Sequence, residues 1–105
     1  MVIVQVRDGK TSYALYADLR ASGDLVIAGH DLSASLADSF GRDEYEYVYT
    51  VRAGAVPRVC ELLGVERAAL LDALHALLSP HGVAASPTWR TWLQTHDVPY
   101  EFSVR

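Results

Sequence analysis

The chain has 105 residues, a length that fits one globular domain, residues 1–105, around a single hydrophobic core. Half of the residues are hydrophobic and 21% are charged, a balance that excludes an intrinsically disordered chain. Nine basic and thirteen acidic residues give a net charge of −4, which opposes generic binding to nucleic acid, and the single cysteine excludes an intrachain disulfide and a Cys-rich zinc site.

The first ten residues, MVIVQVRDGK, have no positively charged segment ahead of the apolar run, and that run is too short for a signal peptide or a membrane span. Together with the single cysteine, this favours the reducing cytoplasm. The basic residues are mostly Arg and Ala is abundant, which is the bias expected of a GC-rich bacterial genome. We therefore expect a cytoplasmic bacterial protein with no membrane partner.

Residues 2–29 predict a three-stranded β-meander. Two apolar-rich stretches within residues 2–19 flank Asp8-Gly9, a dipeptide that suits the type I′ turn of a hairpin. A second Gly-containing turn then leads to residues 25–29, LVIAG, which are short and β-branched as in a third strand.

The period changes in residues 30–41, HDLSASLADSFG. Leu32, Leu36 and Phe40 fall four apart, and Gly41 stands where a helix would end in a left-handed residue. This stretch predicts a short helix with one apolar face.

Residues 41–52 place tyrosine at every second position, which is the period of a β-strand. One face of this strand takes Tyr45, Tyr47, Tyr49 and Val51, and the other takes Glu44, Glu46, Val48, Thr50 and Arg52. The charged face can stay in water, so we expect the tyrosines to lie beneath helices as one wall of the core. A stacking platform for a ligand is the alternative.

The rest of the chain predicts three helices and a closing strand. Pro57 permits a helix that Gly64 ends, and the leucine-rich residues 65–78 give the strongest helical pattern. A Ser-Pro-His-Gly break follows, then a helix capped by Ser86, and residues 99–105 alternate as a terminal strand. This order predicts an α+β fold, with a mainly antiparallel sheet of about five strands and three to four helices packed on one face.

Acidic residues concentrate between residues 31 and 46, where five carboxylates stand against Arg42, so this segment carries a charge equal to the whole net charge of −4. The carboxylates belong to Asp31, Asp38, Asp43, Glu44 and Glu46. One interpretation is a solvated loop and strand edge, which charge clusters usually are. The other is a docking surface for a protein partner with a basic surface, where charge accelerates association and selects orientation.

No spacing in the sequence predicts a catalytic or metal site. GxSxG, P-loop and GxGxxG patterns are absent, and the pairs His30-Asp31 and Asp43-Glu44 match no metal-binding loop. Cys60 lies in an apolar helical stretch, where a thiol is usually inert. Two tryptophans flank Arg90 in a core-like stripe that offers too few cations for a nucleic-acid-binding helix. We expect no catalytic residue, metal, cofactor or nucleic acid.

The segment GDLVIAGHDL, followed by the acidic DEYEY strand and then LLG, resembles small uncharacterised bacterial α+β proteins. Some of those proteins look like immunity proteins of toxin–immunity systems. The resemblance covers residues 23 to 64 and implies a protein that works by binding another protein. It assigns no catalytic or ligand residue.

We therefore expect a small soluble non-catalytic protein-binding module, immunity- or antitoxin-like or an adaptor, that uses the acidic surface. A small-molecule-binding domain or enzyme is the alternative, with a pocket between sheet and helices and with His30 and Tyr16 near its mouth. A homodimer is a third alternative, through Tyr16 and Val48 on the exposed sheet face or through the last strand as a free edge.

Overall fold

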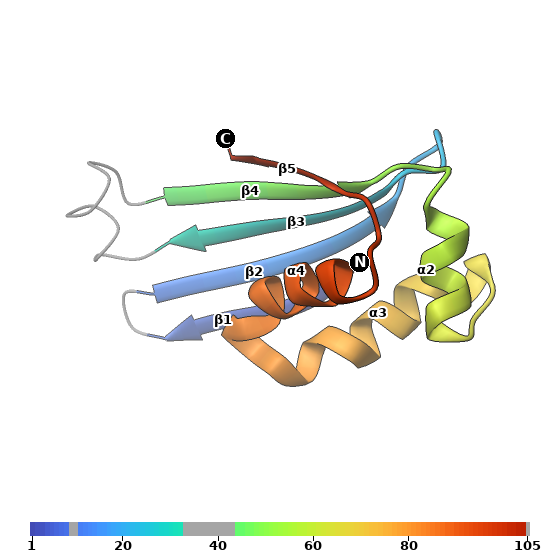
Figure 1. The fold of residues 1–105 in the computed structure, drawn as a ribbon. Helices are drawn as coiled ribbons and strands as arrows, with labels where there is room; N and C mark the ends of the chain where they lie inside the picture. The colour runs from blue at the N-terminus through green and yellow to red at the C-terminus, as the bar shows by residue number, and fades with distance from the viewer. Residues whose placement is uncertain (9–10, 33–43, 105) are drawn as a thin grey trace.

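The computed structural model describes residues 1–8, 11–32 and 44–104, which form an α+β fold (Figure 1). Five strands make one antiparallel sheet, as predicted, and their order in it is β1-β2-β3-β4-β5. The strands are β1 (Val2–Asp8), β2 (Thr11–Leu19), β3 (Leu25–Leu32), β4 (Glu44–Val51) and β5 (Glu101–Val104). The helices are α2 (Val56–Leu63), α3 (Leu70–Leu78) and α4 (Ala85–Thr95), with short 3₁₀ turns η1 (Arg67–Ala69) and η2 (Ser79–Ala84).

The hydrophobic core lies between one face of the sheet and the helices. The strands contribute alternating aliphatic side chains, such as Leu15 of β2 and Ile27 of β3, which are fully buried. Helix α3 contributes Leu70, Leu74 and Leu78, which recur every four residues and are also fully buried. Each such side chain contributes about 1.5–3 kcal/mol on burial, so this layer fixes α3 against the sheet.

Helices α3 and α4 lie across this face of the sheet, while α2 lies at its end (Figure 1). Two helices therefore cover the face in the described part of the chain, fewer than the three to four that the sequence predicts. Only four residues separate helix α2 from the end of β4, so it starts at the end of the sheet, and Gly64, with a left-handed φ of 69°, ends it there. Within residues 1–8, 11–32 and 44–104, no helix combines the length and the apolar character needed to cross a bilayer.

Strand β3 is longer than the sequence indicated. Residues 30–32 continue the strand, whereas the predicted helix spans 30–41; the remainder of that range lies outside the described residues. His30 pairs with Ala14 of β2 on one side and with Glu46 of β4 on the other. Hydrogen bonds to strands on both sides satisfy the backbone here, and they outweigh a local four-residue apolar spacing.

The opposite face of the sheet carries no helix among the described residues, and we call it the helix-free face (Figure 1). An apolar row crosses it because the register places Val2, Tyr16, Ala28 and Val48 side by side on β1 to β4. Val2 and Tyr16 are 46% and 41% exposed. Polar residues flank this row, including His30, Glu46 and Thr50.

Candidate functional site

The helix-facing side of the sheet changes character along its strands. At one end Leu25 pairs with Val51, and both are fully buried in the aliphatic core. Toward the other end Tyr13 pairs with Asp31, so a phenol and a carboxylate share a row on the face that packs on helices. Charged groups are rare at such positions unless they are partnered, which makes this end of the sheet the candidate site.

Tyrosines of β4 reach into this region as predicted. Tyr47 and Tyr49 are 6% and 4% exposed, which confirms that their rings lie beneath the helical layer. Gly29 of β3 makes room for the Tyr47 ring, because a Cβ at this glycine would overlap that ring. The Tyr49 ring packs against Tyr47 edge-on at 5.9 Å and against Phe102 of β5 at 4.8 Å.

Ser86, in the first turn of α4, connects this helix to the phenols. Its backbone N–H donates to Oη of Tyr13 at 3.2 Å, and its Oγ donates to Oη of Tyr49 at 3.4 Å. Ser86 and Tyr13 also form hydrogen bonds with the Tyr47 phenol. Ser86 was predicted to cap α4, but Ala84 is the N-cap and the hydroxyl serves the tyrosines instead.

The phenols of Tyr13 and Tyr47 keep their protons at neutral pH. Burial raises the pKa of both groups above the ordinary value of 10.0, since a phenolate would lose its hydration. They act as neutral hydrogen-bond donors and acceptors. Neither is a general base, which would need a pKa near the working pH.

Between these phenols and α4 lies a cavity of about 200 Å³, which we call the phenol pocket. It is lined by Tyr13, Asp31, Tyr47, Tyr49, Val83, Ser86, Pro87, Arg90 and Phe102. Asp31 is half-buried, and Arg90 is exposed. The guanidinium of Arg90 lies 4.8 Å from the centre of the Phe102 ring, and its Nε donates to Oη of Tyr100 at 3.4 Å. The pocket therefore combines an acidic side chain, a basic side chain and three phenols.

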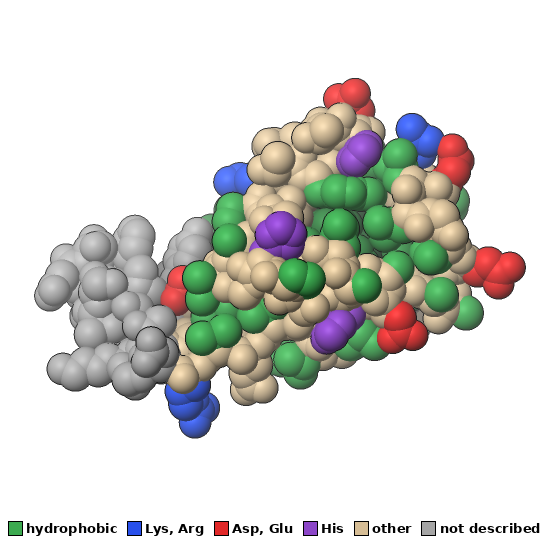
Figure 2. Space-filling view, turned by 90° about the horizontal axis from the view of Figure 1, so that it is seen from below, with side chains coloured by type: hydrophobic (Ala, Val, Ile, Leu, Met, Phe, Trp, Pro, Cys, Tyr) green, Lys and Arg blue, Asp and Glu red, His purple; other side chains and the backbone are tan. Residues whose placement is uncertain are grey.

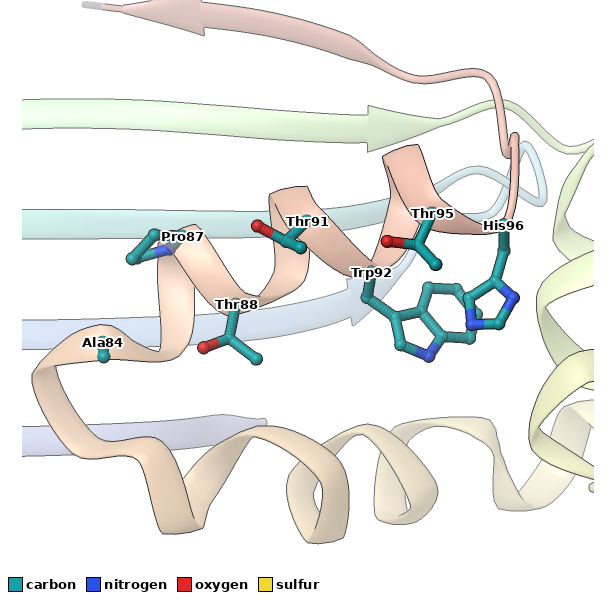
Figure 3. A pocket seen from close by; sticks show the side chains of 7 residues that line it. All are labelled: Ala84, Pro87, Thr88, Thr91, Trp92, Thr95 and His96. Carbon is teal, nitrogen blue, oxygen red and sulfur yellow. The ribbon is translucent and has the colours of Figure 1, made fainter.

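A second concavity of about 440 Å³ runs along the outer side of α4 (Figure 3). Its lining consists of Ala84, Pro87, Thr88, Thr91, Trp92, Thr95 and His96. Trp92 stacks on Trp89 with ring centres 5.3 Å apart, and the ring centre of His96 lies 4.7 Å from that of Trp92. Figure 2 shows this helical side of the molecule, where hydrophobic side chains gather in a hollow and most charged side chains lie near the margin. No Asp, Glu, Lys or Arg of the described chain lines this groove, so it offers contact area rather than charge.

The structure separates the predicted acidic residues. Asp31 lines the phenol pocket on the helix-facing side, whereas Glu46 lies on the helix-free face with its Oε1 3.9 Å from Nε2 of His30. Glu44 begins β4, and nothing is described of its side chain. Asp38 and Asp43 lie outside the described residues. The role of all five acidic residues in partner binding stays a prediction.

The sequence predicted His30 and Tyr16 near the mouth of a pocket between sheet and helices, but neither residue lines the phenol pocket. Side chains alternate between the two sheet faces along each strand. Tyr13 and Asp31 face the helices, so His30 and Tyr16 lie on the helix-free face. Sequence patterns did not indicate that Tyr13, Ser86 and Arg90 line a pocket. A polar residue on an otherwise apolar strand face, such as Tyr13, was the available signal.

Within the described residues, no group of three His, Cys, Asp or Glu side chains is placed to hold a metal ion. Cys60 is a free thiol buried in α2. Comparison of the chain with models of known protein families, with curated proteins and with solved structures finds no match.

Proposed function

We propose that the chain is a small non-catalytic protein-binding module that docks a protein partner with a basic surface on the helix-free face of its sheet. The acidic end of β3 and β4 would steer that partner. The observation that carries this proposal is the concentration of acidic residues in the segment that ends β3 and begins β4, in a sheet whose other face carries no helix among the described residues.

The charge is local to that end. Residues 31–46 contain five acidic residues and one basic residue, while acidic and basic residues balance in the rest of the chain. Where this segment is described, it forms the last residues of β3 and the first of β4, and Leu32 pairs with Glu44. Of the described carboxylates, Glu46 lies on the helix-free face, where it would favour fast and oriented association with a cationic partner, while Asp31 lies on the helix-facing side.

The helix-free face supplies the contact area. Strands of seven to nine residues, at about 3.3 Å per residue and 4.8 Å between strands, give this face roughly 500 Å². Stable specific interfaces bury about 1,200–2,000 Å² in total over both partners and transient ones about 1,000–1,200 Å², so the face is large enough for one side of a transient complex. The apolar row with Val2 and Tyr16 would form its centre.

Several other charges on this face are paired with one another. Arg52 lies 3.3 Å from the carboxylate of Asp24 and 2.7 Å from that of Glu101, and Arg20 lies 3.6 Å from Asp18. Arg7 of β1 also lies on this face, in the row that contains Ser12, Leu32 and Glu44. The resemblance to immunity-like proteins, which implies protein binding, is consistent with this proposal.

The test is affinity capture with the full chain, identification of the captured protein, and measurement of its association rate. Glu44→Gln with Glu46→Gln should slow association several-fold at low salt and much less at 1 M salt, where the Debye length is about 3 Å. The control is Glu66→Gln with Asp72→Asn, an equal charge change at exposed helix-side positions. Equal rates for both double variants would count against the acidic end as the docking site.

A further inference from the structure

An aromatic ring stands out from the apolar row on the helix-free face. Tyr16 of β2 is 41% exposed, although β2 is an interior strand of the sheet. The register sets Ala28 of β3 directly beside it, and Ala14 is its neighbour along β2 on the same face. Both neighbours end in a methyl group, so they cover little of the ring, which rises above this part of the surface.

A carboxylate lies diagonally across from this ring. Glu46 of β4 is two strands and two residues away from Tyr16 on the same face, which places their Cβ atoms about 12 Å apart at about 4.8 Å between strands and 3.3 Å per residue. The Glu46 side chain is 47% exposed, and its Oε1 lies 3.9 Å from Nε2 of His30. A carboxylate offers about four lone-pair positions, so this exposed group can also accept hydrogen bonds from a partner. The other acid beside Tyr16, Asp18, is paired with Arg20 at 3.6 Å.

A guanidinium group fits between an exposed aromatic ring and an exposed carboxylate. A cation is attracted to a ring within about 6 Å of the ring centre, and it pairs with a carboxylate at nitrogen-to-oxygen distances up to about 4 Å. These two reaches together come to about 10 Å, so one guanidinium can meet Tyr16 and Glu46 when the two side chains lean toward each other. Arginine suits this position better than lysine, because its planar group stacks on a ring and presents two N–H groups to a carboxylate at once.

We propose that the helix-free face receives an arginine side chain of the basic partner, whose guanidinium stacks on the Tyr16 ring and pairs with the Glu46 carboxylate. The aliphatic stem of that arginine lies over Ala28, the low point between Tyr16 and Val48 in the apolar row. This contact rests on the proposed function and narrows it, because it specifies which basic residue the partner presents and where that residue binds.

Hexaarginine and hexalysine test the contact on the full chain, since the two peptides carry the same charge and differ in the cationic group. NMR titrations of ¹⁵N-labelled protein follow the amide signals of Tyr16 and Glu46. They are run at low ionic strength and at about pH 8, above the range in which imidazoles ordinarily take up a proton. Hexaarginine should shift both signals and bind about two- to fivefold more tightly than hexalysine, as expected for an exposed contact between a cation and a ring.

Two variants of Tyr16 separate the ring from its apolar area. Tyr16→Leu should abolish the preference for hexaarginine, whereas Tyr16→Phe, which keeps the ring, should retain it. Glu46→Gln should weaken the binding of both peptides, and Asp72→Asn is its control, because it makes an equal charge change at an exposed position of α3. Circular dichroism establishes that each variant is folded.

Three results would overturn the arginine contact: equal affinities for the two peptides, the same preference in Tyr16→Leu as in the wild type, or no shift at Tyr16 and Glu46. The proposed function is decided separately, by the association rates of the captured partner with the two double variants. A partner that the acidic end steers, but that binds Tyr16→Leu as tightly as the wild type, would refute the arginine contact and leave the docking proposal standing. A clear preference for hexaarginine, with a partner insensitive to the acidic end, would refute the docking proposal alone.

Discussion

Replacement of Gly29 by alanine perturbs the candidate site through a single methyl group. The added Cβ would overlap the Tyr47 ring, which cannot move freely because it is buried and hydrogen-bonded to Ser86 and Tyr13. Adding a methyl group to a well-packed region costs about 1–3 kcal/mol. Alanine is more favourable than glycine within a strand by about 0.5–1 kcal/mol, which offsets part of that cost.

Because the added Cβ would overlap a buried ring, the packing cost should lie near the upper end of its range, and we expect Gly29→Ala to lower the free energy of unfolding by about 2 kcal/mol. Urea denaturation measures this directly. The melting temperature should fall by roughly 8–16 °C, at about 4–8 °C per kcal/mol for a domain of this size. Gly54→Ala is the control, because a Cβ there would meet no atom within 4 Å.

A double-variant cycle identifies the ring as the cause. Combining Gly29→Ala with Tyr47→Val removes the obstacle, so the pair should be more stable than the sum of the two single effects by about 1 kcal/mol or more. An unchanged or higher stability of Gly29→Ala, or strict additivity in the cycle, would refute the packing argument.

Three further predictions concern the core, the link to α4 and the acid limb of stability. Leu74→Ala should lower the free energy of unfolding by about 2–5 kcal/mol in urea denaturation, because Leu74 is fully buried in α3; a loss below 1 kcal/mol would contradict the described core. Ser86→Ala should cost about 1–3 kcal/mol in the same assay, since it leaves buried phenols without a hydroxyl partner; wild-type stability would show that the hydroxyl is dispensable. The Ala53 N–H, and then Arg52, hold the pKa of Asp24 below its ordinary 3.8, so this carboxylate stabilises the fold above that pH and its contribution is lost as the pH falls through the folded pKa. Melting curves from pH 6 to pH 2 should therefore show a smaller acid-dependent loss for Asp24→Asn than for the wild type, and identical pH profiles would exclude this contribution.

Local sequence patterns predicted much of the sheet and the helix boundaries. The alternation in residues 41–52 predicted that Tyr47 and Tyr49 lie under the helices, because strand side chains alternate whatever their partners are. Pro57 and Gly64 marked the limits of α2 for equally local reasons, a fixed φ at the first and a left-handed φ at the second.

The predictions that were wrong concern features that depend on residues far apart in sequence. The end of β3 is a strand because β2 and β4 pair with it, which a helical spacing in residues 30–41 cannot show. Ser86 does not cap α4 because its hydroxyl meets Tyr49, 37 residues earlier. The phenol pocket likewise forms only when two strands and α4 come together, so the sequence alone pointed to His30 on the wrong face.

The tyrosines turn toward the helices, and we propose that this orientation leaves the other face of the sheet for a partner. A ¹³C NMR titration of the tyrosine Cζ atoms tests that orientation most directly. Because burial raises the pKa of Tyr13 and Tyr47, their signals should titrate at higher pH than those of an ordinary phenol, whose pKa is 10.0, while the chain remains folded. Stability should then fall as the pH rises above that value, since the unfolded chain releases these protons first. Titration of both phenols at their ordinary pKa in the folded protein would contradict the account.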